Sequence, residues 1–472
     1  MVRKFMMDTS SLGNSKQLPQ YVAALSACLG SIAAGTVLGW TANINELLRD
    51  GNLNGISVDE GEFGWIGSIA TLGAMLMCFS TGFFCNIIGR KWTMLVLVVP
   101  FTLGWLLIIC AENVDMIYAG RFFTGLAGGA FCIAAPLYTS EISENSIRGR
   151  LGSFFQLLLT VGILLAYTFP LIKSNDISST LIHTILCAIF PLIFGVVFFF
   201  QPETPVHLYK KGKIDEAEKS LRRLRGNAYN PKPELEQIKN AIEEEERMNK
   251  PFFESMKTPA AKKASLICFS LMFFQQMGGI NAVIFYTGKI FGDAKIDLLP
   301  QHATLIIGGI QVVATFISTL FIDKVGRKLL LLISGLFMGL STLLLAIYFS
   351  LEKSDMDRDI ITDISFLPVL ALSIFITVFS LGFGPIPWLI SSELFPIEIK
   401  AIASSAAGTF NWLLAFIVTR FYNDIQNGIG TDITFYIFSG LSFIGVVFIF
   451  FVVPETKGKS FDEIQEMLGG QR

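Results

Sequence analysis

The chain has 472 residues, of which 52% are hydrophobic and only 16% are charged, and its formal net charge is −2. Soluble domains are about a quarter charged, so this composition excludes an ordinary soluble protein. We expect no nucleic-acid partner.

Long apolar stretches recur along the whole chain. A run of about 20 residues with few charges is long enough to cross a bilayer as a helix. Twelve such runs predict an all-α polytopic membrane protein with twelve transmembrane helices. They cover residues 21–45, 63–85, 92–111, 116–140, 151–172, 179–200, 264–291, 303–322, 329–350, 364–392, 401–422 and 433–453.

The loops between these predicted helices differ in charge on the two sides of the membrane. An even number of helices places both termini on one side. The loops on that side hold most of the 36 Lys and Arg residues, and they still hold more than the opposite side when the long loop 201–263 is set aside. Basic loops remain in the cytoplasm, so we expect both termini to be cytoplasmic. The N-terminus has no acidic dileucine retention signal, which favours the plasma membrane.

The loop 201–263 separates six predicted helices from six. Within it, Ile214, Ala217, Leu221 and Leu224 recur at helical spacing, which predicts a short amphipathic helix. The expected division is a cytoplasmic N-terminus 1–20, a six-helix bundle 21–200, the loop 201–263, a second bundle 264–453 and a cytoplasmic tail 454–472.

Three short motifs occur twice, in the same order and at a nearly constant separation. The triplet GRK begins at Gly89 and at Gly326, and PET begins at Pro202 and at Pro454. Between them, a glutamate is followed seven residues later by a basic residue in both halves of the chain. This duplication predicts two parallel repeats of six helices, the architecture of major facilitator transporters.

With these motifs, the chain resembles the sugar porter family of the major facilitator superfamily, from about Leu29 to Glu463. It looks most like the insect facilitated trehalose transporters and related animal hexose facilitators. The motifs that carry the resemblance are GRFFTGLAGG (120–129), PETP (202–205), QQMGGINAVIFY (275–286), GPIPW (384–388) and PETKGKSFDEI (454–464).

Three amides, Gln275, Gln276 and Asn281, interrupt one of the apolar runs. An amide donates and accepts hydrogen bonds without carrying charge, as sugar hydroxyls do, so these side chains can bind a sugar or join helices together. On an ideal helix Asn281 lies far around from the glutamines, and the pair Gly278 and Gly279 can loosen the helix enough to bring them together. The resemblance implies sugar binding, because this segment matches the family's principal sugar-contacting motif.

Other predicted helices supply further candidates for the same site. Gln156 and Gln311 are isolated amides in apolar runs, and Trp388 can stack on a sugar ring or anchor its helix at the membrane interface. The resemblance implies binding roles for Gln311 and Asn411. Two departures from the family pattern, Ser380 and Ala415, remove polar groups and leave trehalose and hexoses open as substrates.

Two further features point to moving parts. Pro385 and Pro387 remove backbone hydrogen bonds and predict a bend in the tenth helix, either as a fixed kink or as a hinge. The resemblance favours the hinge. It also implies that Phe285 and Tyr286 form an outer gate, since they match an aromatic pair that closes the outer mouth in the family.

Charged residues repeat on the expected cytoplasmic side of both halves. Ordinary positive-inside topology explains any single basic residue, but the repeated spacing from glutamate to a basic residue favours salt bridges. We expect them to hold an inner gate shut when the site faces outward and to break when it faces inward. The predicted members are Arg90, Glu141, Arg148 and Arg150 in the first half and Arg327, Glu393 and Lys400 in the second.

The mode of transport is predicted from the missing acidic residues. No predicted helix carries Asp or Glu near its centre, and Val37 stands where the similar proton-coupled porters have an aspartate. We therefore expect facilitated uniport of a neutral sugar, such as trehalose or glucose, with one chain acting as the functional unit in the bilayer.

A proton-coupled symporter and a non-transporting sugar sensor are the alternatives to uniport. The tail ends at Arg472, and sensors tend to have longer signalling tails, so we expect a transporter. His183, His207 and His302 lack metal-ligand spacing, so we expect no metal, no cofactor and no enzymatic activity.

Overall fold

The chain is helical along its length. The computed structural model describes residues 15–144, 146–172, 178–247, 252–295, 298–354, 363–396, 399–459 and 461–469. Apart from an isolated bridge between Leu53 and Ile56, these ranges contain no β-structure. Among the described residues, twelve helices are long and apolar enough to span a membrane, so the predicted fold class is confirmed. All seven cysteines are free.

The first half of the chain supplies six spans and one short connecting helix, α2 (Asn45–Arg49). The spans are α1 (Leu18–Gly39), α3 (Glu60–Ile88), α4 (Arg90–Val96) continued by α5 (Val98–Ile109), α6 (Val114–Ile142), α7 (Arg148–Thr168) and α8 (Ser179–Phe199).

The second half supplies the other six spans, and two of them are broken into a pair of helices. They are α13 (Pro259–Met277) with α14 (Ile280–Asp293), α15 (Pro300–Val325), α16 (Arg327–Lys353), α18 (Leu367–Leu381) with α19 (Ile386–Leu394), α20 (Lys400–Ile429) and α21 (Thr431–Val452).

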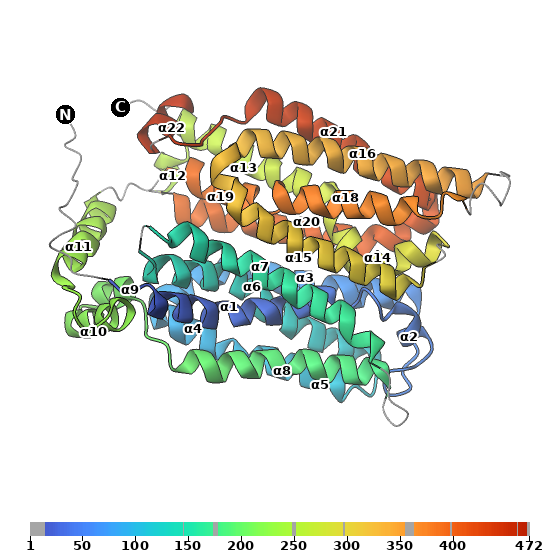
Figure 1. Ribbon diagram of the computed structural model, residues 1–472, viewed down its shortest axis with the longest axis horizontal. Coiled ribbons are helices and arrows are strands. Elements are labelled where there is room, and N and C mark those ends of the chain that lie inside the picture. The colour runs from blue at the N-terminus through green and yellow to red at the C-terminus, as the bar shows by residue number, and fades with distance from the viewer. Residues whose placement is uncertain are drawn as a thin grey trace.

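Short helices gather at one end of the bundle, together with the first and last residues that the structure describes (Figure 1). We call this end the termini face and the opposite end the distal face. The short helices are α9 (Pro205–Lys210), α10 (Ile214–Arg225), α11 (Lys232–Arg247), α12 (Phe252–Ser255) and α22 (Phe461–Met467). In α10, Ala217, Leu221 and Leu224 are buried on one face, whereas the fourth residue of the predicted stripe, Ile214, is exposed.

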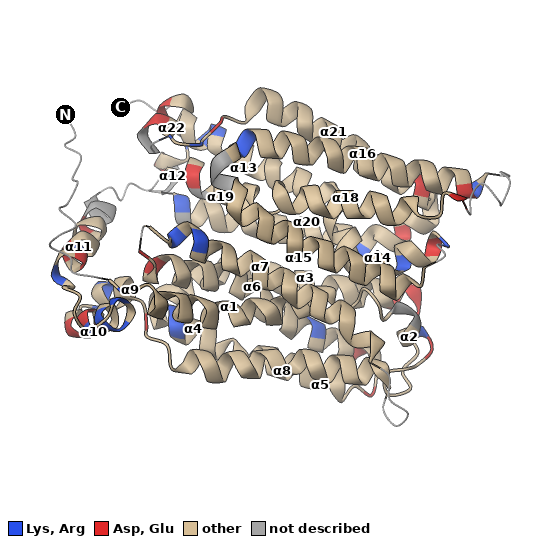
Figure 2. Ribbon diagram, viewed as in Figure 1, with Lys and Arg blue, Asp and Glu red and all other residues tan. Residues whose placement is uncertain are grey.

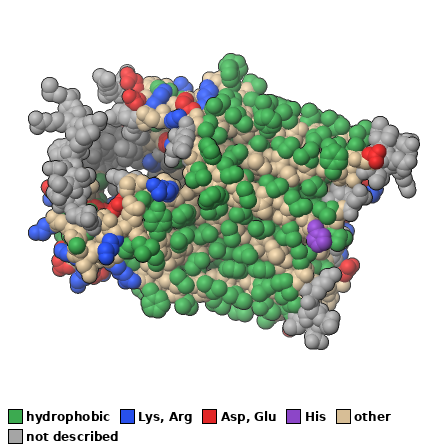
Figure 3. All heavy atoms as spheres, viewed as in Figure 1, with side chains coloured by type: hydrophobic (Ala, Val, Ile, Leu, Met, Phe, Trp, Pro, Cys, Tyr) green, Lys and Arg blue, Asp and Glu red, His purple; other side chains and the backbone are tan. Residues whose placement is uncertain are grey.

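The distribution of side chains over the surface is that of a membrane protein. Charged residues gather at the two ends of the helices, and the middle carries almost none (Figure 2). The space-filling view shows a broad belt of hydrophobic side chains between the ends (Figure 3). Large apolar side chains are exposed here, such as Phe451, which is 77% exposed. Exposure of such a belt to water is unfavourable, whereas its exposure to lipid is favourable.

The two halves meet mainly along two pairs of helices. α3 packs against α20, and α7 packs against α15. Within the first half, α3 and α6 approach so closely that a Cβ on Gly125 would lie 2.0 Å from the carbonyl oxygen of Ala70. Such small-residue contacts are the usual way in which membrane helices pack tightly. Each half is thus a compact bundle, and the surface between them is the place where a site can open.

Candidate functional site

The seventh span is two helices rather than one. α13 ends at Met277 and α14 begins at Ile280, and Gly279 between them has φ +92°. Glycine adopts this left-handed conformation without steric cost. A Cβ at Gly279 would also lie 2.8 Å from Phe438 Cδ2. The glycine pair therefore interrupts the helix, as predicted.

The break brings the candidate amides together in one chain of hydrogen bonds, which we call the amide relay. Asn281 Nδ2 donates to Gln276 Oε1 at 2.5 Å, and Gln276 Nε2 donates to Asn411 Oδ1 at 2.9 Å. Asn411 Nδ2 in turn donates to Gln275 Oε1 at 2.6 Å. All four side chains are buried. Four of the seven predicted binding residues thus form a single unit.

The relay ends at the second broken span. Gln275 Nε2 donates to the carbonyl oxygens of Phe383 and Gly384, at 2.5 and 3.1 Å. These carbonyls lie between α18 and α19, where Pro385 and Pro387 cannot supply N–H donors. The tenth span is therefore broken at the predicted place. Sequence reasoning had not linked the two breaks, because the linking bonds join residues more than 100 positions apart.

The members of the relay differ in what they have left to offer a ligand. Each amide has two N–H donors and an oxygen with two lone pairs. Gln275 spends both N–H groups on the Phe383 and Gly384 carbonyls, so its donors hold the fold together. Gln276 and Asn281 each use one N–H in the bonds above. They keep a second donor and acceptor capacity, which suits them to bind hydroxyl groups.

Gly279→Ala tests whether the break is required. We expect this variant to lower the unfolding temperature clearly, because the left-handed conformation costs a Cβ-bearing residue about 1–2 kcal/mol and the new methyl overlaps Phe438. Gly292→Ala in the same α14 is the matched control, since a Cβ there meets nothing within 4 Å. Thermal unfolding of the purified proteins checks this, and equal losses in both variants would contradict it.

The other predicted binding residues lie outside the relay. Trp388 on α19 packs against α20, where a Cβ at Gly408 would lie 3.2 Å from its ring. Gln311 on α15 is buried, and its Oε1 has no hydrogen-bond partner in the described part of the chain. Gln156 on α7 is half-buried. Within the described ranges, neither Gln156 nor Gln311 forms a side-chain hydrogen bond to the relay.

A narrow recess with apolar walls faces α20 across the plane between the halves. Small residues of three first-half helices line it, among them Ala34, Ala70 and Gly128, and Trp412 of α20 closes it. The Trp412 indole N–H is buried, and no described residue accepts a hydrogen bond from it. Apart from this N–H, the named lining residues offer a ligand hardly any polar side-chain group. Trp412 follows Asn411 directly in the chain, so the recess adjoins the relay.

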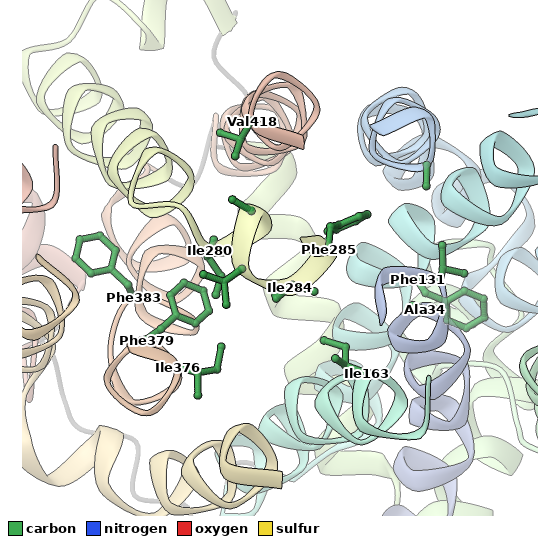
Figure 4. Packing of buried hydrophobic residues seen from close by; sticks show 14 of the residues in the cluster. Ala34, Phe131, Ile163, Ile280, Ile284, Phe285, Ile376, Phe379, Phe383 and Val418 are labelled. Atoms are coloured by element: carbon green, nitrogen blue, oxygen red, sulfur yellow. The ribbon is translucent and has the colours of Figure 1, made fainter. Parts of the chain in front are cut away.

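On the distal side, α14 closes the space between the halves. Tyr167 Oη donates to the carbonyl oxygen of Ile284 at 3.0 Å, and Thr41 Oγ1 donates to that of Phe285 at 3.4 Å. Both donors belong to the first half. Figure 4 shows α14 between Phe379 and Phe383 of the second half and Ile163 of the first, with Phe285 pointing toward the first half.

Tyr286 completes this closure. It is buried, its Oη donates to the Thr419 carbonyl at 2.8 Å, and its ring stacks on Tyr422 at 4.9 Å. The rings of Tyr286 and Phe63 on α3 pack in a T-shaped arrangement, with 6.0 Å between their centres. Among the described residues, the hydrogen bonds that join the two halves all lie on the distal side. The structure is therefore closed at the distal face.

A family comparison covers nearly the whole chain. The family described as sugar (and other) transporter matches residues 23–468. The chain belongs to this sugar transporter family. A facilitated trehalose transporter of Aedes aegypti is 38% identical over 96% of the chain, and that of Culex quinquefasciatus is 36% identical over 96%. The chain spans 55% of the length of the first relative and 86% of the second.

Solved structures of sugar transporters share the fold. The proton:xylose symporter XylE of E. coli, bound to 6-bromo-6-deoxy-D-glucose, has a TM-score of 0.78 and 21% identity, covering 98% of this chain and 100% of its own. An inward-open form of XylE has a TM-score of 0.77 and 22% identity, covering 94% of this chain and 98% of its own. The major facilitator fold is thereby confirmed.

The first half carries an ion-pair network at the termini face. Arg90 Nη2 pairs with Glu141 Oε1 at 2.8 Å, and Thr204 Oγ1 donates to Glu141 Oε2 at 2.6 Å. Glu203 accepts from the backbone N–H of Arg90 at 3.1 Å, so it caps the start of α4. The motifs GRK and PET thus meet in space.

A histidine joins this network, which the sequence did not predict. Arg90 Nη1 donates to His207 Nδ1 at 3.1 Å. Burial and the charge of Arg90 lower the pKa of His207 to about 4, so the ring is neutral at pH 7 and can accept this bond.

The second half repeats the arrangement. Arg327 Nη2 pairs with Glu393 Oε1 at 3.3 Å, and Thr456 Oγ1 donates to Glu393 Oε2 at 2.6 Å. Glu455 accepts from the backbone N–H of Arg327 at 3.0 Å. The duplicated motifs therefore build the same structure twice, once in each half.

Three predicted members of these networks lie elsewhere. Arg148 and Arg150 are exposed, and within the described ranges neither forms an ion pair with Glu141. Lys400 is half-buried and forms no ion pair with Glu393 among the described residues, although burial lowers its pKa and the charge of Glu393 acts in the opposite direction. Both predicted pairings ran from a glutamate in one helix to a basic residue at the start of the next. The intervening turn prevents them from sharing a face.

Proposed function

We propose that the protein carries a neutral sugar across the membrane by facilitated transport, with its two halves exposing the site alternately to each side. The amide relay is the observation that carries this proposal. It places uncharged donors and acceptors at two helix breaks beside the plane where the halves meet. Broken helices at such a plane are where transporters of this architecture hold their substrates. The names of the relatives also favour transport over enzymatic catalysis.

The substrate class follows from the same site. Gln276 and Asn281 offer donors and acceptors for hydroxyl groups, and Trp388 and Trp412 offer aromatic faces for the apolar side of a sugar ring. The relatives named above are facilitated trehalose transporters, so we propose trehalose or a hexose such as glucose. Ser380 and Ala415 have small side chains, and we propose that they favour a wider site that accepts the larger sugar.

Uniport is favoured over proton coupling by the surroundings of a buried arginine. Arg121 on α6 is completely buried, and its guanidinium donates to the carbonyl oxygens of Ile66 at 3.0 Å and Val37 at 2.8 Å. It also lies over the Trp40 ring at 5.3 Å. Among the described residues, no Asp or Glu pairs with it. A carboxylate at such a place would be the obvious proton carrier, so we propose that the sugar gradient alone drives transport.

We propose the same gate and hinge that the sequence predicts. Phe285 and Tyr286 form the gate at the distal face, and the breaks at Pro385 and Pro387 act as a hinge. We place the termini face in the cytoplasm and the protein in the plasma membrane. The Arg90–Glu141 and Arg327–Glu393 pairs each lie within one half and are formed while the distal side is closed, so we propose that they stabilise the cytoplasmic end of each half rather than a gate between the halves. One chain contains both halves of the site, which supports a functional monomer.

Uptake of labelled trehalose, glucose and fructose into proteoliposomes, at two external pH values, tests the proposal. We expect saturable uptake of at least one of these sugars, with equal initial rates at pH 6 and pH 7.5. Faster uptake at the lower pH would favour the symporter instead. Saturable sugar binding without uptake of any sugar would favour a sensor.

A further inference from the structure

A cation and an aromatic ring meet across the two halves on the distal side. Arg420 lies on α20, and its guanidinium carbon is 4.8 Å from the ring centre of Trp65 on α3. Phe416, one turn earlier on α20, packs on the same ring at 6.2 Å. α3 belongs to the first half and α20 to the second, so this contact crosses the plane along which the halves must separate.

The other surroundings of Arg420 leave Trp65 as its partner in the first half. Arg420 Nη1 pairs with Asp424 Oδ2 at 2.7 Å, but Asp424 lies one turn away on the same helix and is 52% exposed. Phe421, also on α20, lies 5.4 Å from the guanidinium. The Arg420 side chain is only 18% exposed, and its Nε is buried without a hydrogen-bond partner among the residues that the structure describes. A guanidinium that has lost much of its water gains more from a ring face than an exposed one does.

The contact lies beside the distal closure. Thr419, the neighbour of Arg420, accepts the hydrogen bond from Tyr286. The backbones of α3 and α20 are close here, since a Cβ at Gly64 would lie 3.6 Å from the Arg420 carbonyl oxygen. Nearer the distal end, Asn427 Nδ2 donates to Glu60 Oε2 at 2.9 Å. The distal ends of the two helices are thus joined at two successive levels.

We propose that Arg420 and Trp65 form a latch that holds the distal side closed and sets the ratio of distal-closed to distal-open protein. Rocking of the halves about a central site separates their distal ends, so the contact exists in only one of the two states. The inference rests on the proposed alternating access. It assigns a conformational role to two residues that neither contact the relay nor belong to the predicted gates.

The test measures the separation of the halves without any sugar. Cys110 is exposed at the distal end of α5, and Ser354 is exposed at the distal end of α16. A Ser354→Cys protein, with the half-buried Cys132 replaced by Ala, is spin-labelled at positions 110 and 354 and reconstituted in nanodiscs. Pulsed electron resonance then gives the distance distribution. We expect a major short distance and a minor longer one.

Arg420→Gln and Trp65→Leu should each lower the ratio of short to long distances by about three- to tenfold. The double variant should resemble either single variant, because each removes the same contact. Arg420→Lys keeps a cation and should shift the ratio less. Asp424→Asn is the matched control: it removes the ion pair within α20, keeps the contact with Trp65 and should leave the ratio unchanged.

An unchanged ratio in Arg420→Gln or in Trp65→Leu would overturn the latch. A shift in Asp424→Asn equal to that in Arg420→Gln would also overturn it, because Arg420 would then act through its own helix. Gel filtration and thermal unfolding identify any variant that fails to fold. If Arg420→Gln fails to fold, the distance ratio of Arg420→Lys tests the latch in its place. These measurements need no sugar. If the distance ratios change as expected but the protein takes up no sugar, the proposed function is refuted and the latch is not.

Discussion

Gln276→Ala is expected to abolish saturable sugar uptake. Gln276 stands in the middle of the amide relay, accepting from Asn281 at 2.5 Å and donating to Asn411 at 2.9 Å. Truncation leaves two buried polar atoms, Asn281 Nδ2 and Asn411 Oδ1, without this partner, each at a cost of about 1–3 kcal/mol, and removes the spare donor that we assign to the sugar. We expect uptake efficiency to fall by at least about 100-fold. Initial rates in proteoliposomes with matched protein content measure this.

The control for this prediction is Gln201→Ala. Gln201 lies just after α8, and its Nε2 donates to Ser26 Oγ at 3.3 Å, far along the chain from any relay residue. It should transport at the wild-type rate. Uptake by Gln276→Ala close to that of Gln201→Ala would show that the sugar binds elsewhere, and the assignment of Gln276 would have to be given up.

We expect Glu141→Ala to lower the free energy of unfolding more than the other substitutions do. The side chain of Arg90 is 5% exposed and that of Glu141 12%, so truncation leaves a buried guanidinium without its carboxylate. Breaking a buried ion pair in this way costs about 3–5 kcal/mol. Thr204 Oγ1 loses its acceptor as well. We expect a marked fall in the thermal unfolding temperature, measured on purified protein in detergent.

The duplicated network supplies the matched control. In the second half, Arg327 and Glu393 are 3.3 Å apart and their side chains are 12% and 22% exposed. A longer and more exposed pair is better screened by water, so Glu393→Ala should lower the unfolding temperature less than Glu141→Ala. An equal or larger loss in Glu393→Ala would contradict the argument from burial.

Local features of the sequence were enough for the architecture. The apolar runs predict twelve spans because lipid requires each span to be apolar and helical over a length that bilayer thickness sets. The glycine pair at Gly278 and Gly279 predicts the break in the seventh span, because only glycine accepts the left-handed backbone there. Pro385 and Pro387 predict the break in the tenth for an equally local reason.

The charge networks show where local reasoning ends. The duplicated motifs identified Arg90, Glu141, Arg327 and Glu393 correctly as members of ion-pair networks. The same spacing wrongly paired Glu141 with Arg148. α6 ends at Ile142 and α7 begins at Arg148, so a helical spacing has no meaning across the turn between them. The true partner, Arg90, is 51 positions away.

The sequence by itself determined the class, the duplication, the helix breaks and the residues able to form a polar site. Only the tertiary structure decided which of them meet. The relay joins Gln276 to Asn411 on α20, and the latch joins Trp65 on α3 to Arg420 on the same helix. Hydropathy and backbone preference are properties of neighbouring residues. A hydrogen-bond or cation–π partner depends on which helices pack together, and this is settled by the shapes of all the helices in the bundle.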